Sequence, residues 1–149
     1  MTIMQSVFDT PPIGMQPMWL VMFQAPAEDI DRVFEAITEI TPLDQGKTDR
    51  NGYRAPSGIE YYRPRAGTPT GAEDETRHRP DVDEMRFYLP RDPDLLSAVI
   101  RAIYDVHSYY EPVITVSEVL RSLCKGLDDS KNPHRWWNKA GDWKNPRSS

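Results

Sequence analysis

The 149-residue sequence contains one cysteine, Cys124. A single cysteine cannot close a disulfide within the chain or form a zinc–cysteine cluster, so we expect a reducing compartment, the cytoplasm. The longest apolar run, Met18–Phe23, is too short to cross a bilayer. No Lys or Arg precedes Arg32, which argues against a secretory signal. Because a glycine period and a sustained heptad are both missing, collagen-like and coiled-coil chains are excluded.

Basic side chains are fewer than acidic ones: 18 Lys and Arg stand against 23 Asp and Glu, which gives a formal net charge of −5. An acidic chain does not suit general binding to nucleic acid or to anionic lipid, so we expect neither as a partner. Fourteen prolines are about twice the usual share. We therefore expect a single domain in which ordered segments are separated by long loops.

Hydrophobic patterning predicts six core elements. Two apolar stripes at helical spacing indicate helices from residue 27 to about 40 and from an N-cap at Asp92 onward. Apolar runs or alternation predict the strands, which lie at residues 18–23, 58–62, 84–89 and 113–120. The resulting order, βαββαβ, is that of an α+β ferredoxin-like sandwich, an antiparallel sheet with two helices on one face. The face of the sheet without helices would be exposed to solvent, and self-association is the usual way to bury such a face.

The rest of the chain divides around this core. We expect residues 1–17 to form an N-terminal arm, residues 18–123 the domain, and residues 124–149 a C-terminal tail. Residues 63–83 hold almost no large apolar side chain and predict a long loop. A loop of this length inside a compact domain is usually functional or disordered.

The segment from His107 to Pro112 is the first candidate site. An imidazole and a carboxylate, His107 and Glu111, beside the phenols of Tyr109 and Tyr110 are suited to binding a metal or to acid–base chemistry. The alternative is structural: His107 ends a helix, where positive charge is favourable, and Glu111 pairs with Arg86 or Arg101. One histidine and one glutamate are an incomplete ligand set for a metal.

Two further segments carry charge or aromatic groups. The basic triplet Arg77–Arg79, which includes His78, is suited to closing over an anion, or else is a solvated loop. The tail holds Trp136, Trp137 and Trp143 among basic residues. Such side chains anchor a tail to the body or to another subunit, cover a ligand, or stack on single-stranded nucleic acid.

Three segments resemble the PII/CutA-like domain inserted in Nif-three-like proteins. They are residues 67–71 (GTPTG), which resemble its Gly- and Pro-containing loop, residues 82–86 (VDEMR), which resemble its Val-Asp-Glu-Val-Arg strand entry, and residues 107–112 (HSYYEP), which resemble its His-Pro-Tyr-Glu-Glu-Pro box. The match spans roughly residues 18–120. Ser108 and Tyr110 depart from the box, and the flanking di-metal domain has no counterpart in this sequence.

The resemblance implies a homotrimer with sites between subunits, where relatives bind small anions, nucleotides or divalent metals. On this basis we expect a small anionic ligand or a divalent metal near the 63–83 loop. Arg77, Arg79 and Arg86 would balance negative charge, and His107 with Glu111 would orient the ligand or coordinate the metal. The remaining residues expected to contact a ligand are His78, Tyr61 and Tyr109.

Two alternatives stay open at this point. The scaffold could carry a small enzyme, an isomerase or hydrolase of an oxygenated, aromatic compound, with His107, Tyr110 and Glu111 as its catalytic groups. The protein could instead be an accessory subunit that docks a partner through its tryptophan-rich tail. Fold class alone does not decide among these functions.

Overall fold

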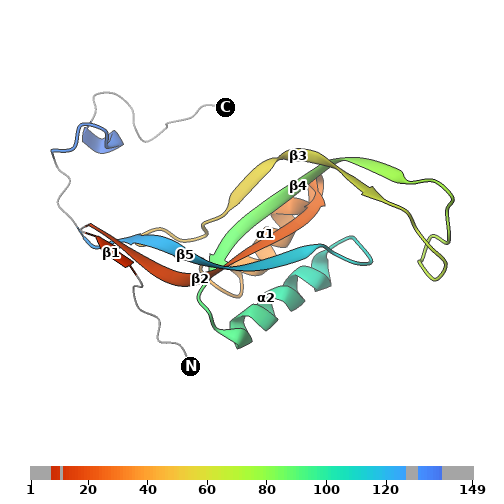
Figure 1. The fold of residues 1–149 in the computed structure, drawn as a ribbon, viewed down its shortest axis with the longest axis horizontal. Helices are drawn as coiled ribbons and strands as arrows, with labels where there is room; N and C mark the ends of the chain where they lie inside the picture. The colour runs from red at the N-terminus through yellow and green to blue at the C-terminus, as the bar shows by residue number, and fades with distance from the viewer. Residues whose placement is uncertain (1–7, 11, 127–130, 139–149) are drawn as a thin grey trace.

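The computed structural model describes residues 8–10, 12–126 and 131–138. Four long strands and two helices form the domain, with a short strand before them and two short 3-10 segments (Figure 1). The elements are β1 (Phe8–Thr10), β2 (Ile13–Pro26), η1 (Ala27–Asp29), α1 (Ile30–Thr38), β3 (Tyr53–Tyr62), β4 (Arg77–Leu89), α2 (Pro93–Val106), β5 (Ile114–Cys124) and η2 (Trp136–Asn138).

The sheet is antiparallel and has β2 near its centre. β2 pairs with β5 on one edge and with β4 on the other, and β3 pairs with the outer edge of β4. β1 adds a short pairing at the start of β2. Both helices cover the same face of the sheet (Figure 1). This confirms the predicted α+β ferredoxin-like βαββαβ fold.

The core lies between the sheet and the helices because side chains alternate along each strand. From the two central strands, Val21, Phe23, Phe87 and Leu89 are buried against the helices. The helices supply the other buried apolar side chains, which are Ile30, Val33 and Ile37 of α1 and Val99 and Ile103 of α2. Leu20, Met22 and Tyr88 alternate with the buried strand residues and lie on the opposite, open face.

All four long strands extend further than the sequence pattern predicts, and β5 continues to Cys124 instead of ending near residue 120. β2 starts at Ile13, inside the segment expected to be an arm, and β4 starts at Arg77, so the long loop ends at residue 76 and not at 83. β3 starts at Tyr53 and not at residue 58. The β3–β4 hairpin projects beyond the helices (Figure 1). There the strands are held by backbone pairing without a buried face, so no apolar alternation marks them.

The predicted C-terminal tail is described only in part. Residues 131–138 include η2, where Trp136 and Trp137 are 54% and 51% exposed. Trp143 lies outside the described residues. Of the helices in the part of the chain that the structure describes, none has the length and apolar character needed to span a membrane.

Candidate functional site

The β3–β4 hairpin sorts the predicted basic triplet onto two faces. Glu60 pairs with Arg79, and Tyr62 pairs with Arg77, so these four side chains share one face of the hairpin. The intervening pair falls on the other face, where the rings of Tyr61 and His78 stack with 4.3 Å between centroids and 12° between planes. The triplet therefore does not act as one basic cluster.

The loop that joins these strands is closed by its own hydrogen bonds. The backbone N–H of Glu73 donates to the carbonyl of Pro64 at 3.1 Å, and that of Gly71 donates to the carbonyl of Thr68, also at 3.1 Å. Gly67 and Gly71 have positive φ angles of 97° and 83°, which glycine adopts without a steric cost. The Gly-rich segment singled out in the sequence is therefore the bend of this loop.

The turn between α2 and β5 is anchored to β2 through His107. The backbone N–H of Tyr109 donates to His107 Nδ1 at 3.0 Å, so Nδ1 is unprotonated. The other nitrogen, Nε2, then carries the proton and donates to the Gln24 carbonyl at 2.6 Å. Both ring nitrogens are engaged, and His107 is the C-cap residue of α2. In this arrangement neither nitrogen has a lone pair available for a metal or a substrate proton.

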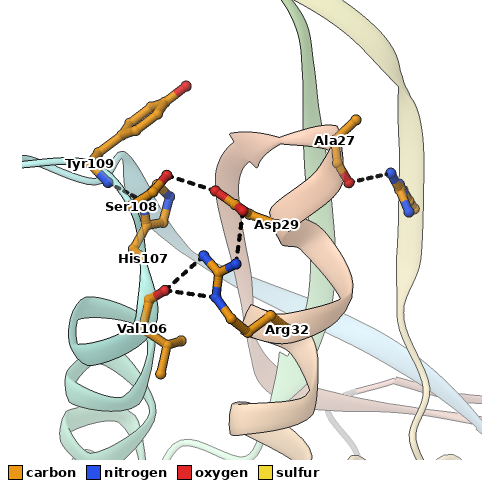
Figure 2. Close-up of polar contacts among 8 residues, drawn as sticks. Ala27, Asp29, Arg32, Val106, His107, Ser108 and Tyr109 are labelled. Carbon is orange, nitrogen blue, oxygen red and sulfur yellow. Dashed lines mark hydrogen bonds and ion pairs between the residues drawn. The ribbon is translucent and has the colours of Figure 1, made fainter.

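A second anchor ties the same turn to α1 (Figure 2). The Ser108 hydroxyl donates to Asp29 Oδ2 at 2.6 Å, and Arg32 Nη1 donates to Asp29 Oδ1 at 2.8 Å. Arg32 also donates to the Val106 carbonyl through Nε and Nη2. These contacts, first of all that from Arg32, hold the pKa of the buried Asp29 carboxyl below its ordinary value against the opposing effect of burial. The turn is thus fixed in place at both α1 and β2.

Hairpin, loop and turn together enclose a cavity of about 520 Å³, which we call the hairpin pocket. Its volume is in the range of small-molecule sites. The pocket is lined by Glu60, Tyr61, Tyr62 and Arg79 of the hairpin, Arg63, Pro64, Thr68, Pro69 and Thr70 of the loop, and Ser108, Tyr109, Tyr110, Glu111 and Val113 of the turn and the residue before β5.

Two buried donors in this pocket have no acceptor. Neither Arg79 Nε nor Tyr109 Oη makes a hydrogen bond to any described residue, although both atoms are shielded from solvent. The Arg79 guanidinium lies over the Tyr109 ring, with 5.4 Å from Cζ to the ring centroid. Buried polar atoms are almost always hydrogen-bonded, and those that are not call for an explanation.

Burial and neighbouring charge set the protonation of the phenols. Burial, followed by the nearby Glu60 carboxylate, raises the pKa of Tyr109, so its hydroxyl stays protonated and can donate. The guanidiniums beside Tyr62, first Arg79 and then Arg77, lower the pKa of that phenol. The Tyr62 contact in turn raises the pKa of Arg79, which stays a cation.

The structure brings together some of the predicted site residues and separates others. Tyr61, Arg79, Tyr109, Tyr110 and Glu111 line the hairpin pocket, as does the Thr68–Thr70 part of the Gly-rich loop. Arg77, His78, Arg86 and His107 do not line it.

The predicted ion pairs of Glu111 are wrong, because Arg86 pairs with Glu84 and Arg101 with Asp105. Glu84 lies two residues from Arg86 on the same face of β4. Asp105 lies one helical turn from Arg101 on α2.

The sequence patterns did not single out Glu60 or Arg63 as site residues. The register of β3 shifts between Ala55 and Glu60, and no local sequence pattern indicates such a shift. The pairing of Glu60 with Arg79 therefore could not be predicted from strand alternation.

Among the described residues, no group of three His, Cys, Asp or Glu side chains is placed to hold a metal ion. A second, more open hollow of about 760 Å³ adjoins the hairpin pocket and shares Tyr110 and Glu111 with it. It lies along α2, whose Ile100 and Tyr104 contribute to its lining.

No protein-family model and no curated protein sequence matches this chain. Solved structures do. A NIF3-related protein from Bacillus cereus is similar with a TM-score of 0.58 and 17% identity over 74% of this chain and 29% of that protein. The divalent ion tolerance protein CutA1 from Ehrlichia chaffeensis has a TM-score of 0.51 and 18% identity, over 68% of this chain and 79% of that one. These likenesses show that the fold is PII/CutA-like. The chain spans 29% of the length of the NIF3-related protein.

Proposed function

We propose that this protein binds a small anionic ligand in the hairpin pocket. The observation that carries the proposal is the pair of buried donors, Arg79 Nε and Tyr109 Oη, which have no acceptor among the described residues. Leaving a buried donor unpaired costs about 1–3 kcal/mol, and more for a charged group. An acceptor that enters the pocket removes this cost, which favours binding.

Each of the two groups has a proton to donate. An arginine side chain has no acceptor atom and does not lose its proton in proteins. The raised pKa of Tyr109 keeps its phenol neutral, with a proton to donate. A ligand that satisfies both must present acceptor oxygens, and a negatively charged group is the strongest acceptor for a guanidinium.

We propose further that the protein is a homotrimer and that the pocket lies in a cleft between subunits. The open sheet face, with Leu20, Met22 and Tyr88, supports self-association, because partly exposed apolar side chains there gain from burial. Tyr110, 69% exposed at the mouth of the pocket, supports a neighbour close to the site. Closure by a second copy would complete the binding site.

A divalent metal is the second candidate ligand. Two carboxylates, Glu60 and Glu111, line the pocket, and the CutA1 neighbour is described as a divalent ion tolerance protein. His107 would have to release one of its two backbone contacts to join them. A metal would therefore need ligands from a second copy or from the anion itself.

The test combines native mass spectrometry of untagged protein with calorimetry against phosphate, ATP, benzoate and Mn²⁺. We expect a trimer mass and binding of at least one anion. Arg79→Gln should weaken that binding at least tenfold, because the orphaned donor and its charge are lost.

Arg77→Gln is the matched control, since Arg77 lies on the same hairpin face and contacts Glu73 and Tyr62 but does not itself line the pocket. Binding of Mn²⁺ alone would favour the metal candidate. Failure of every anion to bind, or equal binding by Arg79→Gln and wild type, would overturn the proposal.

A further inference from the structure

We infer that the ligand of the hairpin pocket is a planar aromatic carboxylate with a single negative charge. This inference rests on the proposed function and names the chemical class of its ligand. Three features of the pocket lead to it: the balance of its charges, its aromatic side chains, and the two donors that have no acceptor.

The charged side chains that line the pocket sum to no net charge, so the lining disfavours a ligand with several negative charges. Two cations, Arg63 and Arg79, face two carboxylates, Glu60 and Glu111. Arg77 does not add to the cations, because Glu73 already neutralises it through two contacts. A phosphate or a nucleotide brings more than one negative charge on average, which the carboxylates would repel at short range. A monoanion held by Arg79 adds a single negative charge and meets the least repulsion of any anion.

The walls of the pocket favour a flat, apolar body behind that charge. Tyr62, Tyr109 and Tyr110 contribute phenol rings, and Pro64, Pro69 and Val113 contribute aliphatic surface. The Tyr109 ring is fixed by Arg79 on one side and by the edge contact with His107, at 4.7 Å between centroids. Tyr110 is 69% exposed and gains the most from a ring packed against it.

Each of the two donors has a proton for an acceptor, and a carboxylate offers two acceptor oxygens. Arg79 comes from β4 and Tyr109 from the turn after α2, so a ligand that accepts from both joins the hairpin to the turn. The turn cannot easily move away from this arrangement, because Ser108 is tied to Asp29 and His107 to Gln24. Glu111 also lines the pocket and can accept from a hydroxyl group on the ligand ring.

The test is calorimetry of the full chain with five probes. Benzoate and 4-hydroxybenzoate carry both features, cyclohexanecarboxylate has the charge without the flat ring, and benzamide has the ring without the charge. Phosphate has no ring and carries more than one negative charge on average at neutral pH. We expect both benzoates to bind, cyclohexanecarboxylate to bind about tenfold more weakly, and benzamide and phosphate to give no measurable heat.

Variants assign the binding to the proposed atoms. Arg79→Gln should abolish benzoate binding, and Tyr109→Phe should weaken it about threefold to tenfold while keeping the ring. Arg77→Gln should stay within twofold of wild type. Thermal unfolding of each variant separates a lost contact from a lost fold, and Tyr109→Phe remains informative if Arg79→Gln does not fold.

The outcomes separate this inference from the proposed function. Phosphate or ATP binding that exceeds benzoate binding and depends on Arg79 would overturn the aromatic carboxylate while the anion site stands. Binding of cyclohexanecarboxylate as tight as that of benzoate would likewise overturn the aromatic ligand alone. Absence of binding by every anion, ATP included, would overturn both.

Discussion

Asp29 is a buried carboxylate that joins two parts of the chain far apart in sequence. Its oxygens accept from Arg32 on α1 and from Ser108 in the turn that borders the hairpin pocket. Because its pKa is lowered in the folded protein, the anion stabilises the fold at pH values above the ordinary pKa of 3.8. That contribution is lost as the pH falls below 3.8 and through the folded-state pKa.

Asp29→Asn tests this role. At about pH 7 we expect the free energy of unfolding to fall by about 1–3 kcal/mol, because two charge-assisted contacts are weakened in a buried position. The difference from wild type should shrink at about pH 3, because below the ordinary pKa of 3.8 the unfolded chain takes up the proton and the stabilisation by the folded-state anion declines. Urea denaturation at both pH values measures it. Asp31→Asn, with a side chain 88% exposed, is the control and should change little; an equal loss in both variants would contradict the role of Asp29.

At the same scale, the site chemistry depends on atoms whose neighbours come from distant segments. Arg79 looks like one member of a basic triplet in sequence, but its partner residues are Tyr62 and Tyr109. His107 looks like a ligand or a catalytic base, but its two nitrogens are taken by backbone groups. Sequence identified both as residues of interest, and only their contacts distinguish their roles.

Helices and strands that bury one face have the capping residues and apolar spacing from which they were predicted, and α2 is the clearest case. α2 begins as predicted at an N-cap, Asp92, whose carboxylate accepts from the backbone N–H groups of Asp94 and Leu95 at 3.0 and 3.4 Å. Pro93 occupies the first turn, where its missing N–H costs nothing. The buried stripe of α2 includes Val99 and Ile103, at the spacing of one helical turn.

Asp92→Ala removes this cap. We expect the free energy of unfolding to fall by about 0.5–2 kcal/mol, because two backbone donors at the start of α2 lose their acceptor. Asp92→Asn keeps a capping oxygen and should retain most of the stability. Guanidinium denaturation followed by circular dichroism compares the three proteins, and an Asn variant as unstable as the Ala variant would contradict the capping role.

The β3–β4 hairpin is the part of the fold that sequence patterns predict least well. Residues 77–81 are polar and include Pro80, yet they form the first part of β4. Backbone pairing with β3 holds them, and the β-bulge region at residues 55–60 shifts the register. A strand outside the helix layer has no buried face, so the two-residue hydrophobic period that reveals strands is missing there.

At the scale of the whole molecule, the helices cover one face of the sheet and leave the other open (Figure 1). Met22 lies on the open face of the central strand, paired with Arg86 and Thr115 on either side. If three copies bury this face, a glutamate at its centre must give up its hydration, and the desolvation cost of a buried charge can exceed what a neighbouring cation such as Arg86 returns.

Met22→Glu is therefore expected to lower the oligomer mass in native mass spectrometry to that of the monomer, and to weaken ligand binding if the site lies between subunits. Lys47→Glu, in the exposed loop after α1, is the matched control and should leave the mass unchanged. A trimer that survives Met22→Glu, or a monomeric wild type, would count against assembly through this face.

Hydrophobic periodicity alone was enough to establish the order of the elements and the fold class. A helix with one buried face repeats its apolar side chains about every 3.6 residues and such a strand about every two, so the sequence itself shows the repeat. The three short segments that resemble PII/CutA-like domains led to the same fold.

The hairpin pocket, by contrast, depends on contacts between residues that no local pattern relates. Pairing across β3 and β4 sets Glu60 beside Arg79, and the ties of Ser108 to Asp29 and of His107 to Gln24 hold Tyr109 against them. These partners are up to 83 residues apart in the chain. Packing of the whole domain brings them together, and it also decides which buried donors lack an acceptor.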